Sequence, residues 1–192
     1  MTKEEYRQQI FGLAKDSLEK HILRQELDTE KFKIWMCRNP DNSFYWYRVV
    51  AIPGCLIVQG DVGNRIFTMY DADPVSWIKG AAKSPDYVMG KCEDKRKDFL
   101  SGEAKVLLQE LLQENDLEEC SSKNETLVRK VEDIEEAWYD EGDGDQFSRA
   151  YCEAGFDSED LLSCYDFNSD VIWSYLCLKK FVELLGTQAA TV

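Results

Sequence analysis

The side chains that could do chemistry are few, and most of them are acidic. The 192 residues include 37 Asp/Glu, 23 Lys/Arg, seven Cys and one histidine, His21. A hydrolytic triad needs a base beside its nucleophile, and His21 is distant in sequence from any plausible catalytic Ser or Cys. We expect His21 to complement the dipole at the end of a first helix. We expect the cysteines to be reduced core residues. The sequence therefore predicts a protein that is not an enzyme.

Two acidic stretches, Asp140–Asp145 and Asp166–Val171, resemble calcium loops at first sight. An EF-hand loop needs oxygen ligands at positions 1, 3 and 5, Gly at position 6 and Glu at position 12. The first stretch has glycine at positions 3 and 5, and the second lacks both the Gly and the Glu. The sequence contains no CxxC pair, which is the spacing typical of a structural zinc site. We expect no metal and no cofactor.

The glycine-rich segment Gly60–Asn64 lies between two apolar runs. A phosphate cradle would need a helix directly after it, whereas the residues that follow are typical of a strand. The segment therefore predicts a hairpin turn. An alternative stays open, in which Asp61, Asn64 and Arg65 form a small-molecule or nucleotide site of a binding protein or enzyme.

The charge is uneven along the chain. Residues 1–97 carry a formal charge of +2 and residues 98–192 a charge of −16. Within the helix expected at Glu125–Tyr139, the acids occupy the C-terminal half, where the helix dipole disfavours them. Two interpretations remain: a solvated face that favours solubility, or a surface that imitates nucleic-acid phosphates. The predicted binding residues are Glu132, Asp133, Glu135, Glu136, Asp140, Glu141, Asp143, Asp145, Glu114, Glu118 and Glu119.

The second interpretation depends on the spacing of these acids. Carboxylates four residues apart on a helix repeat at about 6 Å along its axis. Duplex DNA presents one phosphate per about 3.4 Å on each strand. Several helical acids with an acidic loop could approach that density. The expected partner is a protein with a basic nucleic-acid groove, such as a nuclease, a repressor or a CRISPR effector.

The net charge of −14 argues against direct binding to nucleic acid or to an anionic membrane, since both require a basic surface. No apolar run reaches the roughly 18 residues of a spanning helix. The first ten residues lack the pattern of a secretory signal. We therefore expect a cytoplasmic protein.

The elements that must position these residues can be read from local patterns. Thr2 and Glu5 form a capping box that opens a helix reaching toward Leu23. Asp73-Pro74 opens another helix. Four strands are expected between them, at Phe32–Cys37, Ser43–Ile52, Cys55–Gln59 and Arg65–Tyr70. Further helices are expected at Glu103–Asn115, at Glu125–Tyr139, around Leu161 and from Ser169 to a stop at Gly186.

Short connections between the strands predict an antiparallel meander. The predicted fold is α+β: a four-stranded antiparallel meander flanked by helices over residues 1–97, followed by an acidic helical half over residues 98–192. The two halves could pack as one body, because no Pro- or Gly-rich linker separates them.

The strand region resembles a widespread family of small proteins encoded by phages and prophages. The resemblance covers residues 32–92. It is carried by Arg38-Asn39-Pro40, Phe44–Tyr47, Ile52-Pro53-Gly54, Leu56–Val58, Gly60-Asp61-Val62-Gly63, Ile66-Phe67, Trp77, Tyr87 and Lys91-Cys92. It implies a phage or prophage origin and carries over no catalytic residue. With the acidic surface, it predicts a non-enzymatic, anti-CRISPR-like inhibitor of a defence protein in the host cytoplasm. A phage adaptor working through exposed Tyr45 and Tyr47 is a further alternative.

Overall fold

The computed structural model describes residues 1–113 and 122–189. The chain forms two compact units, each built from two separate stretches. The acidic unit comprises Met1–Tyr6 and Lys97–Asp166, and the sheet unit comprises Arg7–Arg96 and Phe167–Val192. The ranges expected from the charge pattern, 1–97 and 98–192, cut across this division, because the C-terminal helix groups with the sheet.

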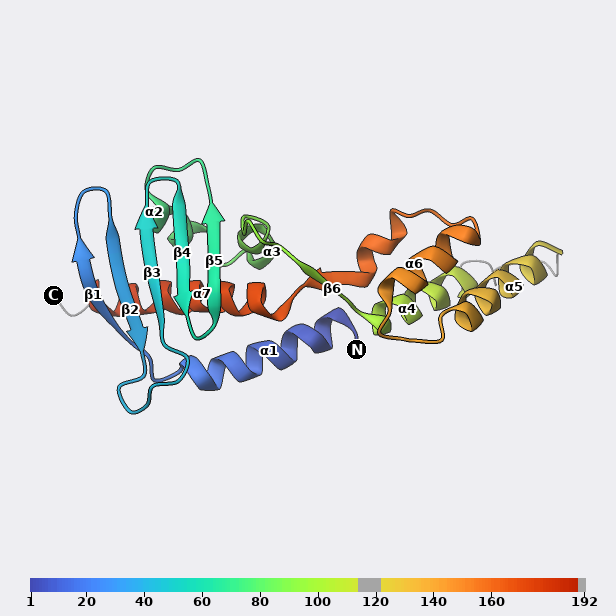
Figure 1. Cartoon of the computed structure of the whole chain (residues 1–192), viewed down its shortest axis with the longest axis horizontal. Coiled ribbons are helices and arrows are strands. Elements are labelled where there is room, and N and C mark those ends of the chain that lie inside the picture. The colour runs from blue at the N-terminus through green and yellow to red at the C-terminus, as the bar shows by residue number, and fades with distance from the viewer. Residues whose placement is uncertain (114–121, 190–192) are drawn as a thin grey trace. The chain divides into compact units, whose positions relative to one another are not determined.

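An antiparallel sheet with the order β1-β2-β3-β4-β5 forms the centre of the sheet unit (Figure 1). The strands are β1 Ile22–Asp28, β2 Lys33–Arg38, β3 Tyr47–Ile52, β4 Cys55–Gly60 and β5 Gly63–Thr68. The α+β class and the antiparallel meander are confirmed, but the sheet has five strands instead of four. The additional strand, β1, takes the place of the expected continuation of the first helix toward Leu23. That helix, α1, is Lys3–Leu18.

Local signals placed the turns and helix starts of this unit correctly. Gly54, between β3 and β4, has a φ of +78°, as position i+2 of a type II turn requires. The Asp73 carboxylate accepts hydrogen bonds from the backbone N–H groups of Val75 and Ser76. It thereby caps α2, Pro74–Ala81. A short helix that was not predicted, α3, follows at Pro85–Met89.

One face of the sheet packs on the C-terminal helix α7, Ser169–Ala189. In Figure 1, α2 and α7 lie behind the strands, on the same face of the sheet. The Trp35 and Phe181 rings are 5.0 Å apart, and the buried Tyr47 hydroxyl donates to the Cys177 carbonyl at 3.0 Å. The expected stop at Gly186 is wrong, because α7 continues through that residue.

The opposite face of the sheet carries an aliphatic row. The row crosses all five strands through directly paired residues, and none of its members is buried. Its members are Leu27, Ile34, Val50, Ile57 and Ile66. Both faces of the central strands are therefore apolar, although α2 and α7 cover only one of them.

The acidic unit is mainly helical. Its elements are β6 Lys97–Phe99, α4 Ser101–Gln113, α5 Ser122–Ala137, α6 Gly144–Glu153, the 3-10 helix η1 Asp160–Cys164 and β7 Tyr165–Phe167. The expected register of α5 is confirmed, since Val131, Ile134 and Trp138 lie in the core. α6 was not predicted, and its Phe147 and Tyr151 complete that core.

Candidate functional site

The acids of α5 lie on the solvent side of the helix. Val131 and Ile134 face the core, whereas Glu132, Asp133 and Glu136 are exposed between and beyond them. Glu135 is exposed on the same helix. Within residues 1–113 and 122–189, none of these four carboxylates has a hydrogen bond or an ion pair. The helix ends at Ala137, so all four lie in its C-terminal half.

The acids of the following loop have local structural partners. Asp143 caps α6 by accepting from the N–H groups of Asp145 and Gln146 at 3.0 and 2.9 Å. Asp140 accepts from the Gly142 N–H at 3.0 Å. Asp145 lies in the first turn of α6, where the dipole favours an acid. Local structure thus explains these acids in part, in contrast to those of α5.

Glu141 is also exposed, and it pairs with Lys105 of α4 at 2.7 Å. Three of the predicted binding residues, Glu114, Glu118 and Glu119, lie outside the described residues. The structure therefore places eight of the eleven predicted acids within the acidic unit, all of them at the surface.

A hollow of about 670 Å³ opens beside the loop acids. Four acids line it, together with Lys97 and the Phe99 and Tyr165 rings; the acids are Asp98, Asp140, Asp143 and Asp145. The Asp98 carboxylate accepts from the Tyr6 hydroxyl at 2.8 Å. A cationic side chain with an apolar stem would match this lining, because the acids would face its charge and the rings its methylenes. Among the described residues, no group of three or more His, Cys, Asp or Glu is arranged to hold a metal ion.

The predicted hairpin at Gly60–Asn64 is confirmed, with Gly60 paired to Gly63 across the turn. A Cβ at residue 60 would collide with the backbone of Trp46 and Tyr47, which explains the glycine there. The three residues of the possible ligand loop lie together in this hairpin.

Those three residues differ in their surroundings. Asp61 and Asn64 are exposed. The Arg65 side chain is only 14% exposed, and it donates to Asp170 of α7 at 2.9 Å and to the Asn64 carbonyl at 2.8 Å. The guanidinium therefore joins β5 to α7, which is a structural role.

His21 does not complement a helix dipole, contrary to expectation. It lies beyond the end of α1 and is only 3% exposed. Its Nε2 is 2.9 Å from the Tyr45 carbonyl oxygen, and its Nδ1 has no partner among the described residues. Burial lowers the pKa of His21, and the nearby Lys180 charge acts in the same direction. The ring is therefore part of the core.

The adaptor alternative requires both Tyr45 and Tyr47 to be exposed, and this is wrong for one of them. Tyr47 is fully buried. Tyr45 is 43% exposed and stacks flat against Trp173, with the ring centres 5.4 Å apart. The two tyrosines therefore do not form a common exposed surface.

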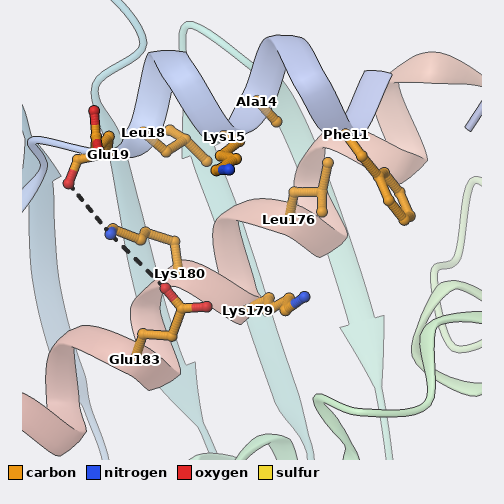
Figure 2. A pocket seen from close by; sticks show the side chains of 9 residues that line it. All are labelled: Phe11, Ala14, Lys15, Leu18, Glu19, Leu176, Lys179, Lys180 and Glu183. Atoms are coloured by element: carbon orange, nitrogen blue, oxygen red, sulfur yellow. Dashed lines mark hydrogen bonds and ion pairs between the residues drawn. The ribbon is translucent and has the colours of Figure 1, made fainter. Parts of the chain in front are cut away.

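A groove between α1 and α7 was not predicted from the sequence (Figure 2). Its volume is about 480 Å³. Phe11, Ala14 and Leu18 line it from α1, and Leu176 lines it from α7, with Lys15 and Lys179 also at its walls. Local patterns could not reveal it, because it exists only once two helices from opposite ends of the chain lie side by side.

No family model, curated protein or solved structure matches this chain. Across the described residues, no helix is both long and apolar enough to cross a membrane.

Proposed function

We propose that the protein is a non-enzymatic inhibitor whose acidic unit occupies the basic groove of a nucleic-acid-binding protein. The observation that carries this proposal is the set of four exposed α5 carboxylates, Glu132, Asp133, Glu135 and Glu136, which have no partner among the described residues. A partner rich in Lys and Arg would supply the missing counter-charges.

The placement of these acids supports binding over solubility alone. Each acid near a helix C-terminus costs about 0.3–1 kcal/mol. Like charges four residues apart, as at Glu132 and Glu136, cost about 0.2–0.5 kcal/mol more. A solubility function would be served equally well by acids at the N-terminal end of α5, where they would stabilise the helix. Concentration of the acids at the unfavourable end is expected of a surface shaped by a partner.

The charge of the whole acidic unit points in the same direction. It holds 7 Lys/Arg against 23 Asp/Glu, a formal charge of −16, whereas the sheet unit holds 16 against 14, a charge of +2. Such a concentrated field steers a basic partner toward the unit and weakens as salt rises. The exposed Tyr139 ring, 85% accessible next to Asp140, offers an aromatic contact of the kind that anchors interfaces.

The partner class follows from the chemistry of a phosphate mimic. A nuclease, a repressor or a CRISPR effector has a groove built for regularly spaced negative charge. A phage or prophage origin, as expected from residues 32–92, would favour a host defence protein among these. The inhibitor would then act in the host cytoplasm and block nucleic acid without binding it.

A salt-controlled capture experiment tests this proposal. The bait is the full chain, retained on a column with a host lysate that contains CRISPR and restriction systems. The test variant is E132Q/D133N/E135Q/E136Q. A control variant, D16N/E30Q/D41N/E93Q, removes four exposed charges from the sheet unit instead. We expect wild type and control to retain a basic nucleic-acid-binding protein at low salt and to release it at high salt.

The test variant should bind that protein at least about fourfold more weakly, since four exposed ion pairs of about 0.2–1 kcal/mol each contribute about 0.8–4 kcal/mol. Equal retention by the test variant, or retention that high salt leaves unchanged, would contradict the proposal. A small-molecule or nucleotide site at Asp61, Asn64 and Arg65 receives no specific support, because the Arg65 guanidinium already pairs with Asp170.

A further inference from the structure

We propose that the groove between α1 and α7 binds an anionic amphiphile, specifically a medium-chain fatty acid in its carboxylate form. This site belongs to the sheet unit and is separate from the acidic surface. It is independent of the proposed inhibitor function, and either can fail without the other.

The shape of the groove suits an apolar chain. Phe11, Ala14 and Leu18 recur at helical spacing along one side of α1, and Leu176 faces them from α7 (Figure 2). The volume of about 480 Å³ lies within the range of about 300–1,000 Å³ typical of small-molecule sites. The Phe11 ring remains partly exposed beside it. A bound alkyl chain would remove this apolar surface from water.

The charges of the groove select an anionic head group. Lys15 and Lys179 project from opposite walls, and both are exposed. Neither has a hydrogen bond or ion pair within the described part of the chain. Glu19 and Glu183 also line the groove, so its lining holds three lysines against two glutamates, a formal charge of +1. A carboxylate held between Lys15 and Lys179 would satisfy both.

The third lysine of the groove is already engaged. Lys180 donates to the Glu19 carbonyl oxygen at 3.3 Å and lies 3.8 Å from the Glu183 carboxylate. Figure 2 shows Glu19, Lys180 and Glu183 joined at one end of the groove, with Phe11 and Leu176 at the other. The Glu183 charge disfavours a second anion at its own end. The groove is therefore suited to one anionic head and one apolar tail.

Calorimetric titration with dodecanoate, below the concentration at which it forms micelles, tests this site. Wild type should bind one dodecanoate per chain. The variant K15Q/K179Q should bind it at least about tenfold more weakly. The control K79Q/K83Q removes two exposed lysines of the same unit that do not line the groove, and it should bind like wild type. Dodecyltrimethylammonium, which has the same chain length and the opposite charge, should not bind.

Several results would overturn the proposal. The first is the absence of dodecanoate binding to wild type. The second is equal binding to wild type and K15Q/K179Q. The third is binding lost on I57K, which would place the chain on the aliphatic row of the sheet instead. An acidic amphipathic peptide that binds in a lysine-dependent way, while dodecanoate does not, would also overturn it and assign the groove to a protein partner.

Discussion

At the scale of single residues, His21 shows how tertiary burial decides the role of a titratable group. Its Nε2–H donates to the Tyr45 carbonyl, and its Nδ1 is buried without a partner among the described residues. Protonation would place a proton and a charge on Nδ1, where nothing accepts it. The position of His21 near a helix end predicts a contact with the helix dipole. The ring is instead enclosed by parts of the chain that are distant in sequence, such as Tyr45 and Lys180.

This burial predicts that the protein loses stability in mild acid. The pKa of His21 lies below its ordinary value of 6.5 in the folded chain, so the unfolded state binds the proton more readily. The stabilising contribution is complete above about pH 6.5 and declines as the pH falls toward the folded pKa. Urea unfolding between pH 7.5 and 5.5 measures the decline. His21→Gln should flatten it, and an equally steep decline in that variant would rule out His21 as its source.

At the scale of elements, the sequence predicts the features that depend on neighbouring residues. It does not predict those that depend on residues distant in sequence. The Thr2–Glu5 capping box forms as expected, with the Thr2 N–H donating to Glu5 at 2.9 Å. The Pro53-Gly54 turn and the Asp73 cap likewise depend on neighbours in sequence. These features need no tertiary context, which is why the sequence reveals them.

The elements that escaped prediction show no clear apolar periodicity, although Asp143 caps α6 as Asp73 caps α2. Strand β1 has six exposed residues out of seven. Because only one of its side chains has to be buried, its sequence does not need the alternation of apolar and polar residues that identifies a strand. Helix α6 follows an acidic turn, and its apolar residues Phe147 and Tyr151 are too few to reveal a helix on their own. The acidic surface was predictable because charge density is a property of sequence, whereas the groove between α1 and α7 was not.

The two faces of the sheet should respond differently to truncation. Leu56 on β4 is fully buried, so Leu56→Ala should lower the free energy of unfolding by about 2–5 kcal/mol. Its neighbour Ile57 lies in the aliphatic row on the other face, and Ile57→Ala should cost only about 1 kcal/mol. Denaturant unfolding of both variants provides the comparison. Equal losses would mean that the outer face is covered in solution.

The acidic helix should become more stable when its unfavourable charges are removed. In E132Q/D133N/E135Q/E136Q, repulsion along α5 and the conflict with its dipole both disappear. The free energy of unfolding should rise by about 1–2 kcal/mol at low salt, and the gain should shrink as salt increases. Thermal unfolding at two ionic strengths checks this. A destabilised variant would show that the carboxylates support the fold.

At the scale of the whole molecule, the two structural units differ in charge as well as in fold. The acidic unit carries −16 and the sheet unit +2, although each unit draws on both ends of the sequence. The division assigns different chemistry to each unit. The helical unit has a carboxylate-rich surface, and the sheet unit has a groove with two lysines that have no partner among the described residues. Residues 98–192 therefore do not act as one acidic half, because α7 belongs to the sheet unit.

The most direct test of the central claim is inhibition of nucleic-acid cleavage by the basic protein that the acidic unit captures. We predict that wild type blocks cleavage at low salt and that added DNA competes with it. The control D16N/E30Q/D41N/E93Q should inhibit equally well. The variant E132Q/D133N/E135Q/E136Q should remain folded and inhibit at least about fourfold more weakly. Full inhibition by the folded test variant would contradict the account.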